Sequence, residues 1–306
     1  MVDPGYLIGL DNPCMGAFLA KTLFILLLAA VIVGTAAYFT WDLFIRPERE
    51  LVQEKSAPPT PPPPDPALPE FNKAMETLKG DDLLAARDAF TKFVEQNPRS
   101  SKVEEAKDRL GKINTDLFLS THPTPEKQVY VVRPNDVLNK VARITKTTPE
   151  LLMRTNKLSG TMLRIGQQLY YTPAEFSLVI SKKDKKVTLL NHGKFFKQYP
   201  ITTLPVSHTA GKKASTPPPK VLQGKVVEKI AWGSGGSRVT FSDKEFAEAT
   251  FWISHTVAGH TLYSDPGPGS PAKANKPPAG GIGIAPEAAS ELGVLLSKGN
   301  PVIVEN

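Results

Sequence analysis

The 306-residue sequence contains one cysteine, Cys14, and five histidines. A single cysteine cannot form an intramolecular disulfide, and no other residue offers a thiol nucleophile. The histidines, the cysteine and the carboxylates show no spacing typical of metal ligands, so the sequence predicts no metal site. No cofactor is expected, and no nucleic-acid-binding motif is present.

Proline and positive charge, by contrast, are plentiful. The 29 prolines are concentrated in a few places, which is typical of linkers and long loops and not of one compact block. The length predicts two or three domains. The net charge of +7 suits an anionic partner such as a wall polymer or a membrane surface. The alternative is a basic surface that is merely soluble.

One apolar run, residues 22–41, carries no charge over the roughly 20 residues that a helix needs to cross a bilayer core. It predicts a single transmembrane helix after an N-terminal segment, residues 1–21. A cleaved signal peptide is the competing interpretation, although Asp3 and Asp11 are unlike a short basic leader. Basic residues flank the run on both sides, so charge alone does not set its orientation.

After the apolar run, residues 42–69 form a proline-rich linker, stiff because adjacent prolines fix the backbone. In residues 70–121 the apolar residues fall at helical spacing, punctuated at 79–81 and 97–100, which predicts three helices. The letters L-K-G-D-D-L-L-A-A-R-D-A-F and N-P-R-S-S-K-V-E-E-A-K resemble one tetratricopeptide-type repeat. The resemblance implies an adaptor with an exposed groove between Leu83 and Leu110, or helices that only pack against neighbouring parts.

Residues 128–173 predict a βααβ unit. Tyr130 and Val132 alternate as in a strand, Asp136 is expected to cap a first helix, and Thr148 is expected to cap a second. Gly166 then turns the chain into a closing strand. The letters Y-V-V-R-P-N-D-V-L-N-K-V-A and L-R-I-G-Q-Q-L-Y-Y-T-P resemble a LysM domain over its full length.

The LysM resemblance implies a shallow groove that binds the N-acetylglucosamine-containing glycans of peptidoglycan or chitin. Backbone amides would bond the N-acetyl groups, and apolar side chains would cover the methyls. Asn135 replaces the usual glycine of the turn, and asparagine tolerates a left-handed backbone. The alternative is a LysM fold that binds no glycan. The expected groove residues are Pro134, Asn135, Asp136, Val137, Leu138, Met162, Leu163, Arg164 and Ile165.

The last domain, residues 175–306, opens with period-two strands at 176–180 and 187–190 joined by a lysine-rich turn. A second turn at Asn191 to Lys194 leads to a third strand. This opening, and the ending A-G-G-I-G-I-A-P-E-A-A-S-E-L-G-V-L-L-S-K-G-N-P-V-I-V, resemble the two ends of the L,D-transpeptidase catalytic domain. The resemblance implies a mostly β fold.

The resemblance also places Gly281 where that family has its nucleophilic cysteine, Gly283 where it has an arginine, and Tyr263 where it has the catalytic histidine. Glycine has no atom that can attack an acyl group, and tyrosine, with an ordinary pKa of about 10, is a poor base at neutral pH. No catalytic residue is therefore assigned, and a pseudoenzyme is expected. The His192-Gly193 pair matches the family letters but lies in an early hairpin turn.

An active enzyme with an unusual nucleophile is the alternative, using Ser254 or Ser264 with His255 or His260. Two proline-rich loops are expected at 211–219 and 266–278. The domain retains either a stem-peptide cleft with Lys212, Lys213 and Arg238 or only a scaffold that packs. The expected fold class is a multidomain α+β chain in which the transmembrane helix precedes the three domains.

Together the resemblances imply a single-pass protein of the bacterial inner membrane, with residues 1–21 in the cytoplasm and the later domains in the periplasm or cell wall. It is expected to bind peptidoglycan and to tether or organise cell-wall factors. An envelope protein partner is a further expectation.

Overall fold

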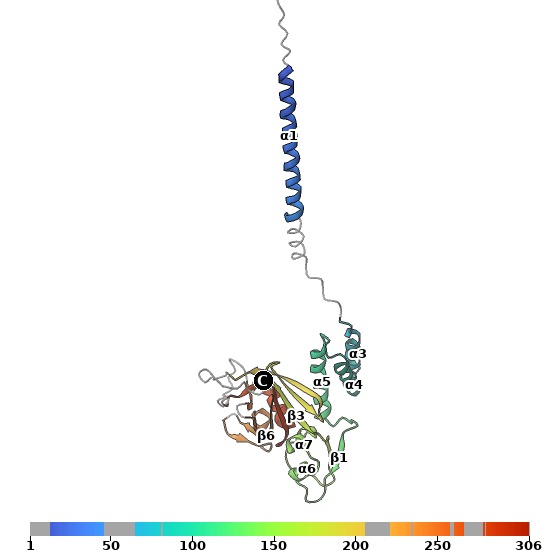
Figure 1. Cartoon of the computed structure of the whole chain (residues 1–306). Coiled ribbons are helices and arrows are strands. Elements are labelled where there is room, and N and C mark those ends of the chain that lie inside the picture. Colours follow the sequence, from blue (N-terminus) through green and yellow to red (C-terminus); the bar gives the residue numbers. More distant parts are fainter. Residues whose placement is uncertain are drawn as a thin grey trace, which may run out of the picture. The chain divides into compact units, whose positions relative to one another are not determined.

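The computed structural model describes residues 13–45, 65–80, 82–205, 221–233, 235–257, 260–265, 278 and 280–305 (Figure 1). The chain divides into two compact units, residues 1–64 and 65–306. The described residues form a mixed α+β structure, as predicted. Residues 1–12, residues 46–64 of the expected linker, the loop expected at 211–219 with Lys212 and Lys213, and residues 266–277 of the loop expected at 266–278 lie outside the described residues.

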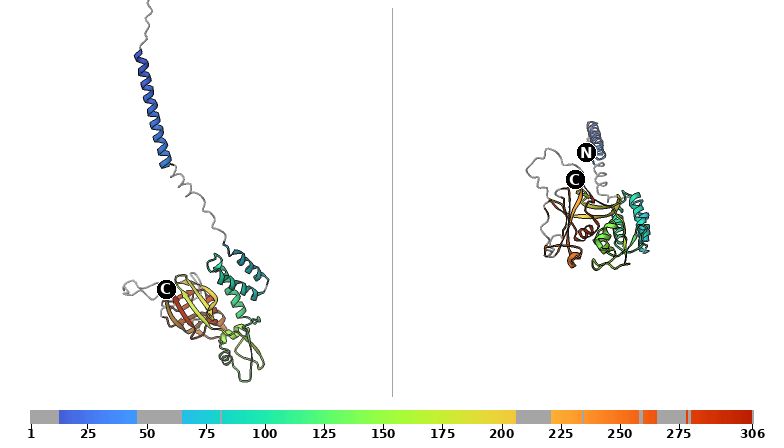
Figure 2. Two further views of the ribbon diagram at one scale, coloured as in Figure 1. Left: turned by 45° about the vertical axis from the view of Figure 1, so that its right-hand side comes forward. Right: turned by 90° about the horizontal axis from the view of Figure 1, so that it is seen from below.

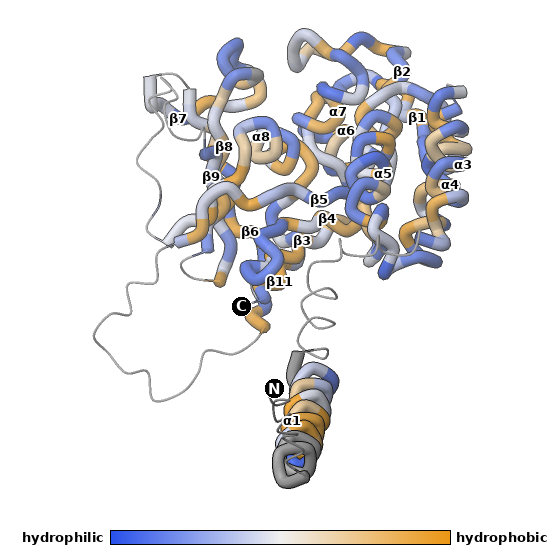
Figure 3. Tube along the Cα trace, turned by 90° about the horizontal axis from the view of Figure 1, so that it is seen from above, coloured by the Kyte–Doolittle hydropathy of each residue, from blue (hydrophilic) through white to orange (hydrophobic). Residues whose placement is uncertain are grey.

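The first unit contains one long helix, α1 (Pro13–Thr40), which continues into a π-helical turn, η1 (Trp41–Ile45). The segment Lys21–Leu43 has 23 residues, and the tube of α1 in Figure 3 is orange, and so hydrophobic, over much of its length. Its apolar side chains are exposed. The helix is thus long and apolar enough to cross a membrane, a property that a signal sequence shares.

Three helices begin the second unit, as the periodicity predicted: α3 (Leu68–Lys79), α4 (Leu83–Gln96) and α5 (Val103–Phe118). They share one apolar cluster around Phe71, Phe90 and Phe93. The helix α3 begins at Leu68, two residues before the expected start of the helical region at residue 70. Asp65 explains this start, because its carboxylate accepts hydrogen bonds from the backbone N–H of Ala67 (2.9 Å) and from the Ser100 hydroxyl (2.7 Å).

The expected βααβ unit consists of β1 (Gln128–Val131), α6 (Leu138–Ile144), α7 (Pro149–Thr155) and β2 (Gln168–Tyr171). The two strands are antiparallel, with Gln128 opposite Tyr171. The helices and strands enclose a small apolar cluster that includes Val141, Leu152 and Leu169. Thr148 caps α7 as predicted, because its hydroxyl accepts the Leu151 N–H at 3.1 Å.

The remaining chain is a sheet-rich domain, and its opening hairpins are those predicted. The strands have the order β11-β3-β4-β5-β10-β9-β8-β6-β7. The short 3₁₀-helix η2 (Lys244–Glu248) and the helix α8 (Pro286–Leu295) interrupt them. The strands, in chain order, are β3 (Phe176–Ser181), β4 (Lys186–Asn191), β5 (Lys194–Thr203), β6 (Val221–Trp232), β7 (Arg238–Val239), β8 (Thr250–His255), β9 (Leu262–Ser264), β10 (Ile282–Ile284) and β11 (Pro301–Glu305).

This sheet closes on itself because β6 is long enough to serve two neighbours. Its first half pairs with β11, with Val221 opposite Glu305, and its second half pairs with β8, with Trp232 opposite Thr250. Figure 2 shows the strands curving around the core. The helix α8 buries its apolar face there, and Gly293 lets it approach closely, since a Cβ at this position would lie 2.4 Å from Phe251 Cδ1.

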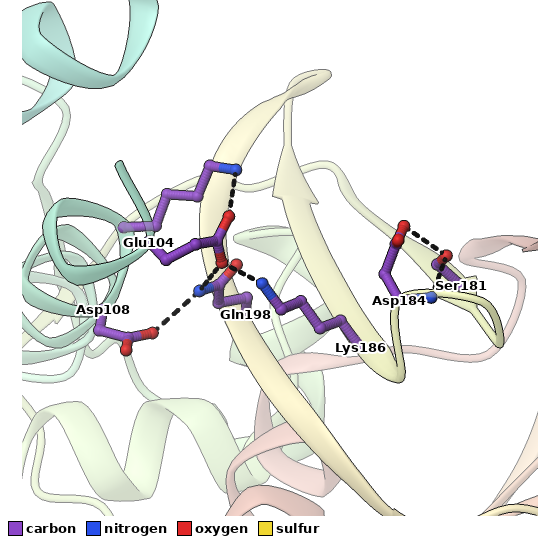
Figure 4. A network of polar contacts seen from close by, with 7 residues as sticks. Glu104, Asp108, Ser181, Asp184, Lys186 and Gln198 are labelled. Carbon is purple, nitrogen blue, oxygen red and sulfur yellow. Dashed lines mark hydrogen bonds and ion pairs between the residues drawn. The ribbon is translucent and has the colours of Figure 1, made fainter. Parts of the chain in front are cut away.

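Polar networks fix α5 onto the sheet (Figure 4). Glu104 on α5 pairs with Lys186 of β4, and Gln198 of β5 donates to Glu104 (3.1 Å) and to Asp108 (2.9 Å). Partial burial opposes ionisation, but hydrogen bonds from Lys186, Gln198 and Lys107 outweigh it and lower the pKa of Glu104 to about 2. The helix is therefore attached by its ionised carboxylate.

A second, more buried network joins α5, β5 and α8 around Glu291. Its carboxylate lies 2.7 Å from Lys197 Nζ and accepts hydrogen bonds from the hydroxyls of Thr115 (2.8 Å) and Tyr199 (3.0 Å). Burial, and then the Glu291 charge, raise the pKa of Tyr199 well above its usual range. The three helices and the sheet domain are thereby held as one body.

Candidate functional site

The two loops predicted to form the glycan groove lie side by side. Val132, after β1, exchanges backbone hydrogen bonds with the other loop: its N–H donates to the Gln167 carbonyl (2.9 Å), and its carbonyl accepts from the Gly166 N–H (2.8 Å). Asn135 has a left-handed backbone with φ 65°, as expected for that turn, and Gly166 has φ 82°. The sequence thus correctly placed both turns.

Asp136 does not cap α6, which corrects the sequence prediction. The N-cap residue is Val137, and it has no side-chain cap. The Asp136 carboxylate instead accepts from the Arg133 N–H (2.9 Å) and the Tyr130 hydroxyl (2.8 Å), and pairs with Lys140 (2.9 Å). These bonds lower its pKa to about 2, the Arg133 N–H contributing most. Its side chain braces the loop and does not face outward.

The nine expected groove residues differ in exposure. Leu138 is buried in the apolar cluster, and Leu163 packs against it. Three apolar side chains are instead open to solvent: Val137 (62% exposed), Met162 (91%) and Ile165 (73%). Pro134, Asn135 and Arg164 are exposed as well. The prediction of a glycan site therefore depends on these six residues and on the loop backbone.

The three positions that the resemblance assigned to lost catalytic residues, Tyr263, Gly281 and Gly283, also come together. The strands β9 and β10 are parallel neighbours, and their register places Gly283 beside Tyr263. Gly281 comes directly before β10, and a Cβ built on it would lie 2.9 Å from Tyr263 Cδ1 and 2.8 Å from Pro278 Cγ. The tyrosine ring and a proline thus fill the space that a side chain at position 281 would need.

Tyr263 is only 7% exposed. Burial, and then the nearby charge of Asp265, raise the pKa of its hydroxyl above the usual 10. The hydroxyl therefore stays protonated at neutral pH, where it cannot act as a base. A side chain at Gly283 would meet Asp265, whose carboxylate accepts from the hydroxyls of Thr202 (2.7 Å) and Thr203 (2.5 Å). Sequence reasoning missed this carboxylate.

Of the serines and histidines proposed for an unusual enzyme, Ser254 and His255 lie on β8 and Ser264 lies on β9, whereas His260 lies between these strands. His255 Nε2 faces the His260 carbonyl at 2.7 Å, and burial lowers its pKa. Ser264 is 2% exposed. Continuing the β8–β9 register places Ser264 opposite Phe251, four residues from His255, or roughly 14 Å along the strand. Ser254 is next to His255, so their side chains point to opposite faces. Neither serine is therefore placed as the partner of His255.

Two tryptophans lie near the strand position of Tyr263, which sequence reasoning also missed. Trp252 is directly opposite Tyr263 in the β8–β9 register and so shares its face of the sheet. The Trp232 ring lies 5.3 Å from Trp252, between centroids. Arg238, expected to serve a peptide cleft, lies over the Trp232 ring and bonds Glu228 at 3.0 Å.

The adaptor groove expected between Leu83 and Leu110 is filled. Leu110 is buried, and Leu83 packs against the same cluster as α4 meets α5. The other side of α5 lies on β5, where the Asn114 amide donates to the Phe196 carbonyl at 2.8 Å. The helices thus pack against their neighbours, the second of the two outcomes weighed from sequence. Within the described residues, no three His, Cys, Asp or Glu side chains gather as metal ligands.

Comparisons with known proteins found one family model and several solved structures. Residues 130–171 match the LysM domain model. Solved L,D-transpeptidase structures also match: one from Mycobacterium smegmatis (20% identity, 46% of this chain and 64% of that one, TM-score 0.28), L,D-transpeptidase 1 of Mycobacterium tuberculosis (14%, 46% and 67%, 0.27) and one from Stackebrandtia nassauensis (14%, 43% and 56%, 0.28).

The match spans less than two thirds of the Mycobacterium smegmatis and Stackebrandtia nassauensis chains. At these identities and TM-scores the structural matches say nothing of activity. No curated protein was found to match the chain. Residues 130–171 are therefore a LysM domain, set between a helical segment and a sheet-rich domain.

Proposed function

We propose that the chain is a peptidoglycan-binding protein, anchored in the bacterial inner membrane by α1, whose L,D-transpeptidase-like domain has no catalytic activity. Its role is to tether or organise cell-wall factors. The observation that carries the proposal is the contact between Gly281 and Tyr263. These two residues are neighbours, and neither supplies the thiol or the imidazole that a thiol–imidazole pair needs.

The LysM domain supports the binding half of the proposal. Its two loops expose Val137, Met162 and Ile165 around a backbone that Asp136 braces. Exposed apolar side chains beside fixed backbone amides suit the methyl and amide parts of an N-acetyl sugar. The glycan of peptidoglycan lies outside the cytoplasmic membrane, so residues 65–306 belong in the periplasm or wall and the N-terminus in the cytoplasm.

One experiment tests both halves. The full chain in mild detergent is incubated with sacculi rich in tetrapeptide stems, sedimented, and the muropeptides are analysed by mass spectrometry. We expect the protein to sediment with the sacculi and to leave the muropeptide profile unchanged. New 3→3 cross-links, or loss of the terminal D-alanine, would instead establish an active L,D-transpeptidase. Protein that stays in the supernatant would refute wall binding.

A further inference from the structure

A cleft of about 600 Å³ lies where the LysM domain meets the sheet domain. One wall is the end of α7 and the residues up to Gly160, and the other is the segment from Phe241 to Phe246 with part of α8. Phe241 packs against the LysM cluster, and Phe246 packs against the core of the sheet domain. The floor is thus built from the edges of two packed cores, which makes it rigid.

The two walls are fixed to each other. The Thr148 hydroxyl, at the start of α7, donates to the Val294 carbonyl of α8 at 3.2 Å. Lys229 Nζ donates to the Gly293 carbonyl at 2.7 Å and lies 4.0 Å from the Glu150 carboxylate. The cleft therefore does not need to form around a ligand, which reduces the entropic cost of binding.

Three cations line the cleft: Arg154, Lys157 and Lys244. All three are exposed, and none pairs with a carboxylate within the described residues. The cleft also contains two carboxylates. That of Glu150 faces Lys229, and that of Asp243 accepts the Thr240 N–H at 2.6 Å. The charge that is left unpaired in the cleft is positive. The cleft therefore suits an anionic ligand that also has an apolar part to contact the floor of the cleft.

Lys157 is held in place at the rim. It has a left-handed backbone, φ 52°, two residues after the end of α7, and the Leu158 N–H donates back to the Met153 carbonyl at 2.9 Å. Gly160, on the same rim, is two residues before Met162 of the predicted glycan loop. Two residues span at most about 7 Å, so the cleft begins next to the proposed glycan groove.

We propose that this cleft binds the carboxylate-bearing stem peptide of a peptidoglycan strand whose glycan lies on the LysM loops. The inference rests on the proposed wall binding and adds its peptide specificity. A four-residue stem extends to roughly 14 Å, enough to leave a sugar in the groove and place carboxylates beside Arg154, Lys157 and Lys244. The apolar floor contacts the aliphatic parts of the stem.

The test is calorimetric titration of the full chain in detergent with two forms of one ligand, a tetrasaccharide of two N-acetylglucosamine–N-acetylmuramic acid units. One form carries tetrapeptide stems with free carboxylates, and in the other these are amidated. We expect the acidic form to bind about tenfold more tightly. The triple variant Arg154→Gln, Lys157→Gln, Lys244→Gln should bind both forms equally.

A matched variant, Lys183→Gln, Lys185→Gln, Lys298→Gln, removes three exposed lysines elsewhere and should keep the tenfold preference. Binding of N-acetylglucosamine tetramer, which has no stem, reports on the LysM groove and on folding of each variant. If the tetramer binds but the two stem forms bind equally to the unmodified chain, the inference fails and wall binding stands. If no form binds, the proposed function fails and the inference with it.

Discussion

At the scale of single residues, positions 263 and 281 fit each other as they stand. The Tyr263 ring occupies the space next to the Gly281 Cα, and Pro278 closes the other side. A side chain at 281 therefore requires Tyr263 or Pro278 to move. A cysteine introduced at position 281 would place its sulfur beside the ring of the buried Tyr263 phenol, so this substitution alone does not create a thiolate–imidazole pair.

This contact predicts that Gly281→Ala destabilises the sheet domain by about 1–3 kcal/mol, because the added methyl overpacks a filled site. Adding Tyr263→Ala should recover part of the loss, since it removes the neighbouring ring. The measurement is the urea midpoint of the full chain in detergent, followed by tryptophan fluorescence. Gly235→Ala is the control, because a Cβ there meets nothing within 4 Å. Equal midpoints for the two glycine variants would contradict the prediction.

Asp136 shows why residue roles are harder to predict than turns. An aspartate before a helical pattern is commonly a cap. Here the same carboxylate accepts hydrogen bonds from the Arg133 N–H and the Tyr130 hydroxyl and pairs with Lys140, so it does not cap the helix. The capping role and the loop-bracing role differ in energy by only about one hydrogen bond, so the sequence does not show which role Asp136 takes. The left-handed Asn135 was predictable because few residues tolerate that backbone.

At the scale of elements, α5 is joined to β4 and β5 through an ionised carboxylate, as Figure 4 shows. Glu104 has a folded-state pKa of about 2, below its ordinary 4.5. On acidification the unfolded state therefore takes up the proton first. The stabilisation from Glu104 is complete above pH 4.5 and is lost as the pH falls toward 2.

We accordingly expect Glu104→Gln to lower the free energy of unfolding at pH 7 by less than about 1 kcal/mol, since the ion pair with Lys186 is partly exposed. The melting temperature should fall slightly. The difference between variant and unmodified chain should shrink between pH 5 and pH 3. The measurement is a set of melting curves of the variant and the unmodified chain across this pH range. Glu76→Gln, whose carboxylate pairs only with Lys79 on the surface of α3, is the control. A difference that grows on acidification would refute the assignment.

Local elements were predictable where a local pattern defines them. The three helices, the βααβ unit and the hairpins from Phe176 to Thr203 follow from periodicity and turn residues. The pairing of β11 with both β3 and β6 did not follow, because strand order depends on contacts between residues far apart in sequence. The cleft between α7 and η2 was missed for the same reason.

At the scale of the whole molecule, residues 65–306 form one compact unit. The Thr148–Val294 and Lys229–Glu150 contacts join the LysM domain to the sheet domain, and the Glu291 network joins the sheet domain to α5. Binding by the LysM loops would therefore also set the orientation of the aromatic face at Trp252 and Tyr263. A rigid unit of this kind suits a tether better than independent modules on flexible linkers would.

The membrane assignment gives the last prediction. If α1 is a permanent anchor, the unmodified chain stays in the membrane fraction after alkaline carbonate washing and has its full mass of 33.3 kDa. Ile32→Arg, near the middle of the Lys21–Leu43 span, should reduce the retained fraction, because an arginine at the centre of a span costs about 3 kcal/mol. Ile32→Phe keeps the span apolar and should be retained. A washed-out chain that has lost the residues through α1 would identify a cleaved signal sequence, and the tether would then have to act through the wall alone.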